Sequence, residues 1–60
     1  MKKVLRIIKA GEKTKWIALP ETFTYIPRKG DSIVLNQEIY TVMYVEYDFD
    51  NQTIFIVVIK

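Results

Sequence analysis

The segment IPRKGDSIVLNQEIYTVMYVEY, residues 26–47, contains the signals that decide how this chain folds. Pro27 has a fixed φ and no backbone N–H, so strand structure must pause there. Gly30 follows closely and predicts a turn, because glycine readily adopts a positive φ. Strand-forming apolar residues resume directly afterwards, which predicts strands at residues 32–36 and 38–47 on either side of a tight turn.

The loop before these strands is basic and could either bind a phosphate or direct a strand. Phosphate-binding loops need further glycines and a helix that follows them. Here the single Gly30 precedes a β run, and Asp31 can accept hydrogen bonds from the backbone amides just beyond it. We therefore interpret residues 25–35 as a turn that aims a strand.

The rest of the chain predicts further strands at residues 3–9, 13–19 and 53–59, separated by turns at residues 10–12 and 48–52. No segment has a helical stripe of apolar residues. Phe49, in the last of these turns, is expected to fold back on the core. Short strands at this density predict an all-β fold, a single small five-stranded antiparallel barrel that spans residues 1–60.

The segment TIFIVVI, residues 53–59, is apolar on both faces of the predicted strand. Left exposed, an uncharged β-forming run without proline would promote aggregation. We expect it to be a central strand, with some apolar surface left for a partner. A second copy of the chain is one such partner, and a dimer is the favoured oligomer.

Residues 26–47 resemble the Pro-x-x-Gly-Asp, strand, tight turn, Tyr-x-Val-x-x-Val pattern of small SH3-like β-barrel proteins, which are common in bacteriophages and mobile elements. KOW-like and Tudor-like barrels share parts of this pattern. The resemblance implies that Val42 and Val45 enter the core across a bend, and that binding uses loops or an open sheet edge. The chain departs from the pattern at Asn36-Gln37, where a glycine-containing pair is usual.

Composition excludes several kinds of chemistry. The chain has no cysteine or histidine, so disulfides, Cys/His metal sites and the common nucleophile–base pairs are missing. The acidic turn DFDNQ, residues 48–52, lacks the later glycine and glutamate of an EF-hand loop. We predict no enzymatic activity and no cofactor or metal.

Cysteine-free composition suits the reducing cytosol, which is the predicted location. The opening MKKVLRIIKA mimics the basic start of a signal peptide, but its apolar stretch is short and is interrupted by Arg6. No apolar run is long enough to span a membrane, and no membrane partner is predicted.

Nucleic acid is one candidate partner, because basic residues gather in the first half of the chain and acidic residues in the second. Trp16 could stack on bases beside cations that meet phosphates. This contact set is Lys13, Lys15, Trp16, Arg28 and Lys29. The alternatives are that Trp16 is a core residue and that bases and acids neutralise each other across the sheet.

Another protein is the leading candidate partner. Aromatic residues are plentiful for this length, and a surplus over the needs of the core would be exposed as binding hot spots. The protein-contact set is Tyr40, Tyr44 and Phe55. Alternation along residues 38–47 predicts that Tyr40, Val42 and Tyr44 share one face. By analogy with the phage proteins, the chain would act as an accessory protein or as an inhibitor of a host protein.

Overall fold

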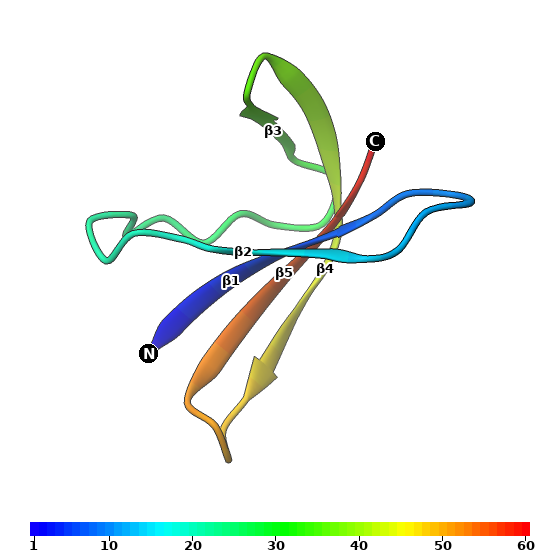
Figure 1. The fold of residues 1–60 in the computed structure, drawn as a ribbon. Helices are drawn as coiled ribbons and strands as arrows, with labels where there is room; N and C mark the ends of the chain where they lie inside the picture. Colours follow the sequence, from blue (N-terminus) through cyan, green and yellow to red (C-terminus); the bar gives the residue numbers. More distant parts are fainter.

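Five strands, all close to the predicted segments, form a single sheet in a computed structural model that describes residues 1–60 (Figure 1). The strands are β1 (Lys2–Ile8), β2 (Lys15–Ala18), β3 (Ser32–Leu35), β4 (Glu38–Asp48) and β5 (Thr53–Ile59). There is no helix with the length and hydropathy needed to cross a membrane. The prediction of an all-β fold is confirmed.

The sheet has the strand order β2-β1-β5-β4-β3 and curls into a half-barrel that is open between β2 and β3 (Figure 1). This arrangement is compatible with a small SH3-like barrel. The pairing differs from the predicted antiparallel barrel in one place, because β1 and β5 are parallel. Successive strands alternate in direction, so the first and the last of five strands run the same way when they meet.

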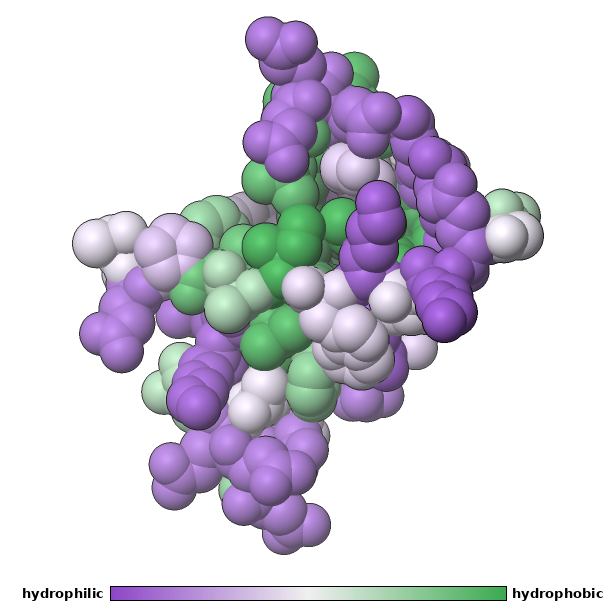
Figure 2. Space-filling view, viewed as in Figure 1, coloured by the Kyte–Doolittle hydropathy of each residue, from purple (hydrophilic) through white to green (hydrophobic).

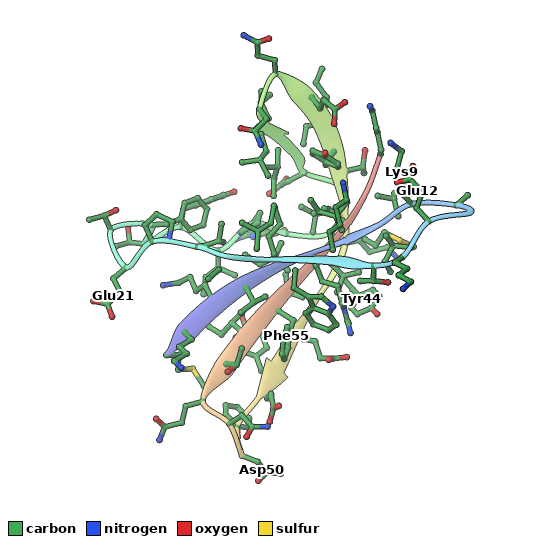
Figure 3. All side chains as sticks on the ribbon, viewed as in Figure 1. Lys9, Glu12, Glu21, Tyr44, Asp50 and Phe55 are labelled. Atoms are coloured by element: carbon green, nitrogen blue, oxygen red, sulfur yellow. The ribbon has the colours of Figure 1, made fainter.

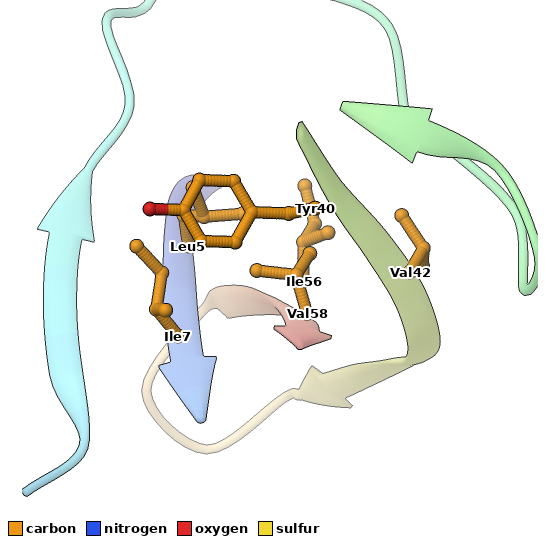
Figure 4. Close-up of a cluster of buried hydrophobic side chains, with 6 residues drawn as sticks. All are labelled: Leu5, Ile7, Tyr40, Val42, Ile56 and Val58. Carbon is orange, nitrogen blue, oxygen red and sulfur yellow. The ribbon is translucent and has the colours of Figure 1, made fainter. Parts of the chain in front are cut away.

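β5 is the central strand, as its two apolar faces predict. It pairs with β1 on one side and β4 on the other, and Ile56, Val57 and Val58 are each 0% exposed. We call the concave face of the sheet, which holds the core, the inner face, and the opposite face the outer face. The core cluster on the inner face is drawn in Figure 4 and consists of Leu5, Ile7, Tyr40, Val42, Ile56 and Val58.

A β-bulge in β4 changes which side chains face the core. The pairing with β5 shifts between Val42 and Tyr44, since Val42 pairs with Val58 whereas Val45 pairs with Ile56. Both valines therefore face inward, across a bend, as the resemblance implied. The extra residue moves Tyr44 to the outer face. The prediction that Tyr40, Val42 and Tyr44 share one face is wrong for this reason.

The turns that flank β3 follow the sequence signals. Asn36 and Gln37 have φ values of 51° and 67°, so both occupy the left-handed region that a tight two-residue hairpin requires. Gly30 has a φ of 92°. The Asp31 carboxylate accepts hydrogen bonds from the Arg28 amide (2.8 Å) and the Tyr25 hydroxyl (3.0 Å), which together lower the pKa of Asp31. The backbone amide that donates to Asp31 therefore comes before it in the chain, whereas the sequence predicted amides just beyond it.

The turn between β4 and β5 overturns the expectation for Phe49. The Asp48 carboxylate accepts hydrogen bonds from the backbone amide (3.2 Å) and the side-chain amide (2.8 Å) of Asn51. These bonds close the turn locally and hold Phe49 near its tip, where it is 76% exposed. Phe49 stacks on Tyr47, with ring centroids 6.4 Å apart, instead of packing on the core.

Candidate functional site: an aromatic cluster on the outer face

The outer face of the sheet gathers large side chains from four strands. Arg6 on β1 lies opposite Trp16 on β2 and beside Val57 on β5, and Val57 in turn pairs with Tyr44 on β4. Phe55 lies two residues before Val57 and therefore on the same face of β5. We call Arg6, Trp16, Tyr44 and Phe55 the outer aromatic cluster; Figure 3 labels Tyr44 and Phe55.

The Arg6 guanidinium holds this cluster together. Its central carbon lies 5.2 Å from the ring centroid of Trp16 and 5.6 Å from that of Phe55. The two rings also contact each other directly, with centroids 5.6 Å apart and an interplanar angle of 78°. This edge-to-face arrangement suits the quadrupoles of the rings, and a cation near their faces is attracted electrostatically.

The polar contacts of Arg6 are few and long. One terminal nitrogen, Nη2, donates a hydrogen bond to the Tyr44 hydroxyl at 3.3 Å and lies 3.7 Å from a carboxylate oxygen of Glu46. The Nε atom is buried and has no hydrogen-bond partner. A guanidinium has five N–H donors, so Arg6 retains donors for a further acceptor. Arg6 thus contacts two aromatic rings but has only one long ion pair.

Exposure distinguishes the cluster from the core. Trp16 is 55% exposed and Tyr44 is 43% exposed, although Val57 beneath them is fully buried. The alternative that Trp16 is a core residue is therefore wrong. Figure 2 shows apolar side chains gathered near the centre of this view and hydrophilic ones around its periphery. The outer aromatic cluster thus presents accessible aromatic rings above a fully buried valine.

The structure brings together residues from both predicted contact sets. Tyr44 and Phe55 were predicted as protein contacts and Trp16 as a nucleic-acid contact, and all belong to the cluster. Tyr40 does not join them. It is buried on the inner face, where its hydroxyl donates a hydrogen bond to the Glu38 carboxylate at 2.8 Å. The bulge in β4 places Tyr40 and Tyr44 on opposite faces.

The predicted nucleic-acid set is dispersed. Lys15 pairs with the core residue Ile7, so its side chain lies on the opposite face from Trp16. Lys13 and Lys15 line a small pocket together with the acidic Glu12 and Glu38. Arg28 and Lys29 lie in the turn before β3, at the other edge of the sheet. No single surface carries all five residues.

Sequence reasoning missed Arg6 and Glu46 as parts of the site. The signal was present in the segment VLRII, residues 4–8, where one arginine interrupts an apolar strand. Alternation places Arg6 on the face opposite Leu5 and Ile7, which are core residues. An arginine flanked in this way must find partners on the outer face, and aromatic rings are suitable partners.

No protein-family model, curated protein sequence or solved structure matches this chain. Within the structure, no three His, Cys, Asp or Glu side chains are close enough to one another to form a metal-binding group.

Proposed function

We propose that this chain is a non-catalytic module that binds another protein through the outer aromatic cluster. The observation that carries the proposal is the exposure of Trp16 and Tyr44 around the guanidinium of Arg6. Tryptophan, tyrosine and arginine are the residue types that most often dominate the binding energy of protein interfaces. Here they converge on one face.

The cluster is also suited to binding because its side chains are already ordered. Trp16 and Phe55 contact each other and Arg6, and each comes from a strand of the sheet. Side chains that are fixed before binding lose little conformational entropy when a partner arrives. A partner that offers an apolar surface with one acidic or carbonyl oxygen for Arg6 fits the cluster.

Single-stranded nucleic acid is the alternative partner, because the exposed ring of Trp16 could stack on a base. Two observations favour a protein instead. The nearest cation, Arg6, already has the Glu46 carboxylate at 3.7 Å. The predicted phosphate contacts Lys15 and Lys29 lie away from Trp16, on the inner face and in a distant turn.

The biological role remains a proposal drawn from the resemblance to small phage barrels. A domain of this size acts by covering part of the surface of a larger protein, which is how it would serve as an accessory protein or as an inhibitor of a host protein. We propose a cytosolic setting for this role, in line with the cysteine-free composition.

The proposal is tested by affinity capture on immobilised wild type and three variants. Trp16→Ala and Tyr44→Ala remove cluster rings, whereas Phe49→Ala removes an even more exposed ring outside the cluster and is the control. We expect a protein that binds the wild type and Phe49→Ala but binds each cluster variant at least about tenfold more weakly. Equal retention on all four proteins would contradict the proposal.

Trp16 provides a second readout, because it is the only tryptophan. Bound protein should shield its fluorescence from acrylamide. Titration with a short labelled single strand at low and moderate salt tests the alternative, since phosphate binding weakens steeply with salt. Salt-sensitive binding of that strand, lost in a Lys15→Glu and Lys29→Glu double variant, would replace the proposal with nucleic-acid binding.

A further inference from the structure

The half-barrel leaves three stretches of backbone without a neighbouring strand. β2 and β3 are the two edges of the sheet. The second half of β4 is a third free stretch, because β3 pairs only with residues 38–41 and the ladder with β5 continues to Asp48. Unpaired edges of this kind are sites where another strand can add.

Charge distinguishes these stretches as surfaces for a second copy of the chain. β2 carries Lys15, with Lys13 just before it, and the free half of β4 carries Glu46 and Asp48. If either stretch paired with its own copy, like charges would be brought together, which is destabilising. β3 has the sequence SIVL, with no charge and no proline. β3 itself therefore lacks the charged side chains and the proline that protect many edge strands, although it is short.

The ladder between β3 and β4 indicates which backbone groups of β3 are free. The Val42 amide donates to Asp31 and the Val42 carbonyl accepts from Gly30, both at 2.8 Å, so the backbone of Val42 faces the β3 side. Because hydrogen-bonded pairs alternate in an antiparallel ladder, the backbone groups of Ser32 and Val34 point to the open side.

The side chains beside this edge are also unusually exposed for aliphatic residues. Val34 is 69% exposed and its cross-strand partner Ile39 is 64% exposed, both on the outer face. Figure 1 shows the β3–β4 hairpin standing away from the rest of the sheet, with no segment beyond β3. A strand added at this edge would cover part of Val34. The segment before β3 lies near the start of this edge, because Phe23, Tyr25 and Pro27 line a pocket with Ser32 and Ile33.

From these observations we propose that two copies of the chain dimerise by antiparallel pairing of β3 with β3. The two-fold axis passes between the two Ile33 residues, so that Ser32 of each copy pairs with Val34 of the other. The outer aromatic clusters stay accessible, because they lie on β1, β2, β5 and the distant half of β4. The dimer therefore does not depend on the proposed function.

The test is light scattering coupled to size-exclusion chromatography over a wide range of protein concentrations. The wild type should change from monomer to dimer as concentration rises, since each β3 offers only a four-residue edge. Val34→Lys should remain monomeric throughout, because it places like charges near each other across the two-fold axis. Position 34 is exposed, so this change should leave the fold intact, and circular dichroism verifies that.

Two controls locate the interface. Val34→Thr keeps a β-branched side chain without charge and should still dimerise, and so should Tyr47→Lys on the free half of β4. Hydrogen exchange of the Ser32 and Val34 amides should slow as the dimer forms. A wild type that is monomeric at every concentration would overturn the proposal. So would a Val34→Lys variant that still dimerises, or a dimer in which these two amides stay unprotected.

Discussion

The two faces of β5 are buried in different ways. On the inner face, Ile56 and Val58 pack against aliphatic side chains and Tyr40, and the curl of the sheet encloses them. On the outer face, Val57 is equally buried, but Arg6, Trp16 and Tyr44 lie around it and no second layer covers them. The comparison shows how a half-barrel can protect an apolar strand with large side chains that remain accessible. The residues that cover the strand are then also available for binding.

The largest effect is expected on the inner face. Ile56 is 0% exposed, so Ile56→Ala removes buried methyl and methylene groups and leaves a cavity. We expect the free energy of unfolding to fall by about 2 to 5 kcal/mol, a large share of the stability of so short a chain. Urea unfolding followed by circular dichroism measures the loss. Val34→Thr, at an exposed position, is the control and should change stability by less than about 0.5 kcal/mol.

A loss below about 1 kcal/mol for Ile56→Ala would mean that the inner face can collapse around the cavity. The contrast between a tightly packed inner face and an outer face that no second layer covers would then be wrong.

An intermediate effect is expected on the outer face, at Arg6. Arg6→Met keeps an unbranched apolar stem over Val57 but removes the cation beside Trp16 and Phe55. We expect the free energy of unfolding to fall by about 1 to 2 kcal/mol, the range for a largely desolvated cation–π contact. Glu46→Gln, which removes only the exposed half of a 3.7 Å ion pair, should cost less than about 0.5 kcal/mol.

The ratio of these two losses distinguishes the aromatic contacts from the ion pair. If Glu46→Gln destabilised the protein as much as Arg6→Met does, the carboxylate would be the main partner of Arg6. The outer face would then be held by charge, and its stability should also fall at high salt.

The inner face could largely be predicted from the sequence. Alternation assigns Leu5 and Ile7 to one side of β1, and the apolar run of residues 53–59 predicts a central strand. The Asn36-Gln37 turn was also predicted, although neither residue is glycine, because two strand-like runs flank a two-residue gap. Each of these features is predicted from neighbouring residues in one short stretch of sequence.

The outer face could not be predicted in the same way, because it depends on register. One extra residue in β4 reverses the face of every side chain beyond it, and strict alternation along residues 38–47 does not include it. Only the resemblance, through the spacing of Val42 and Val45, implied a bend there. The parallel pairing of β1 with β5 brings Arg6 beside Val57, and this contact joins opposite ends of the chain. Phe49 was misplaced because the Asp48–Asn51 bonds compete with the core for that turn.

The smallest effect is expected at the rim of the inner face, where Glu38 links Tyr40 to the last residue of the chain. The Glu38 carboxylate lies 2.6 Å from the Lys60 ammonium and accepts a hydrogen bond from the Tyr40 hydroxyl at 2.8 Å. Both contacts lower the pKa of Glu38 below its ordinary value of 4.5, the Lys60 bond contributing most. The pair is exposed to solvent, so salt should weaken its contribution.

The direction of the pH dependence follows from that lowered pKa. Between the folded and the unfolded pKa, the unfolded chain binds more protons at Glu38 than the folded chain does. The stabilisation by Glu38 is therefore complete above the ordinary value of 4.5 and is lost as the pH falls through the folded pKa. Glu38→Gln should lower the free energy of unfolding slightly at neutral pH. Below the folded pKa of Glu38, the free energies of unfolding of the variant and the wild type should be nearly equal. Urea unfolding at neutral and acidic pH tests this, with Glu21→Gln as the control. If Glu38→Gln had the same pH dependence of stability as the wild type, the contacts of Glu38 with Lys60 and Tyr40 would not stabilise the inner face.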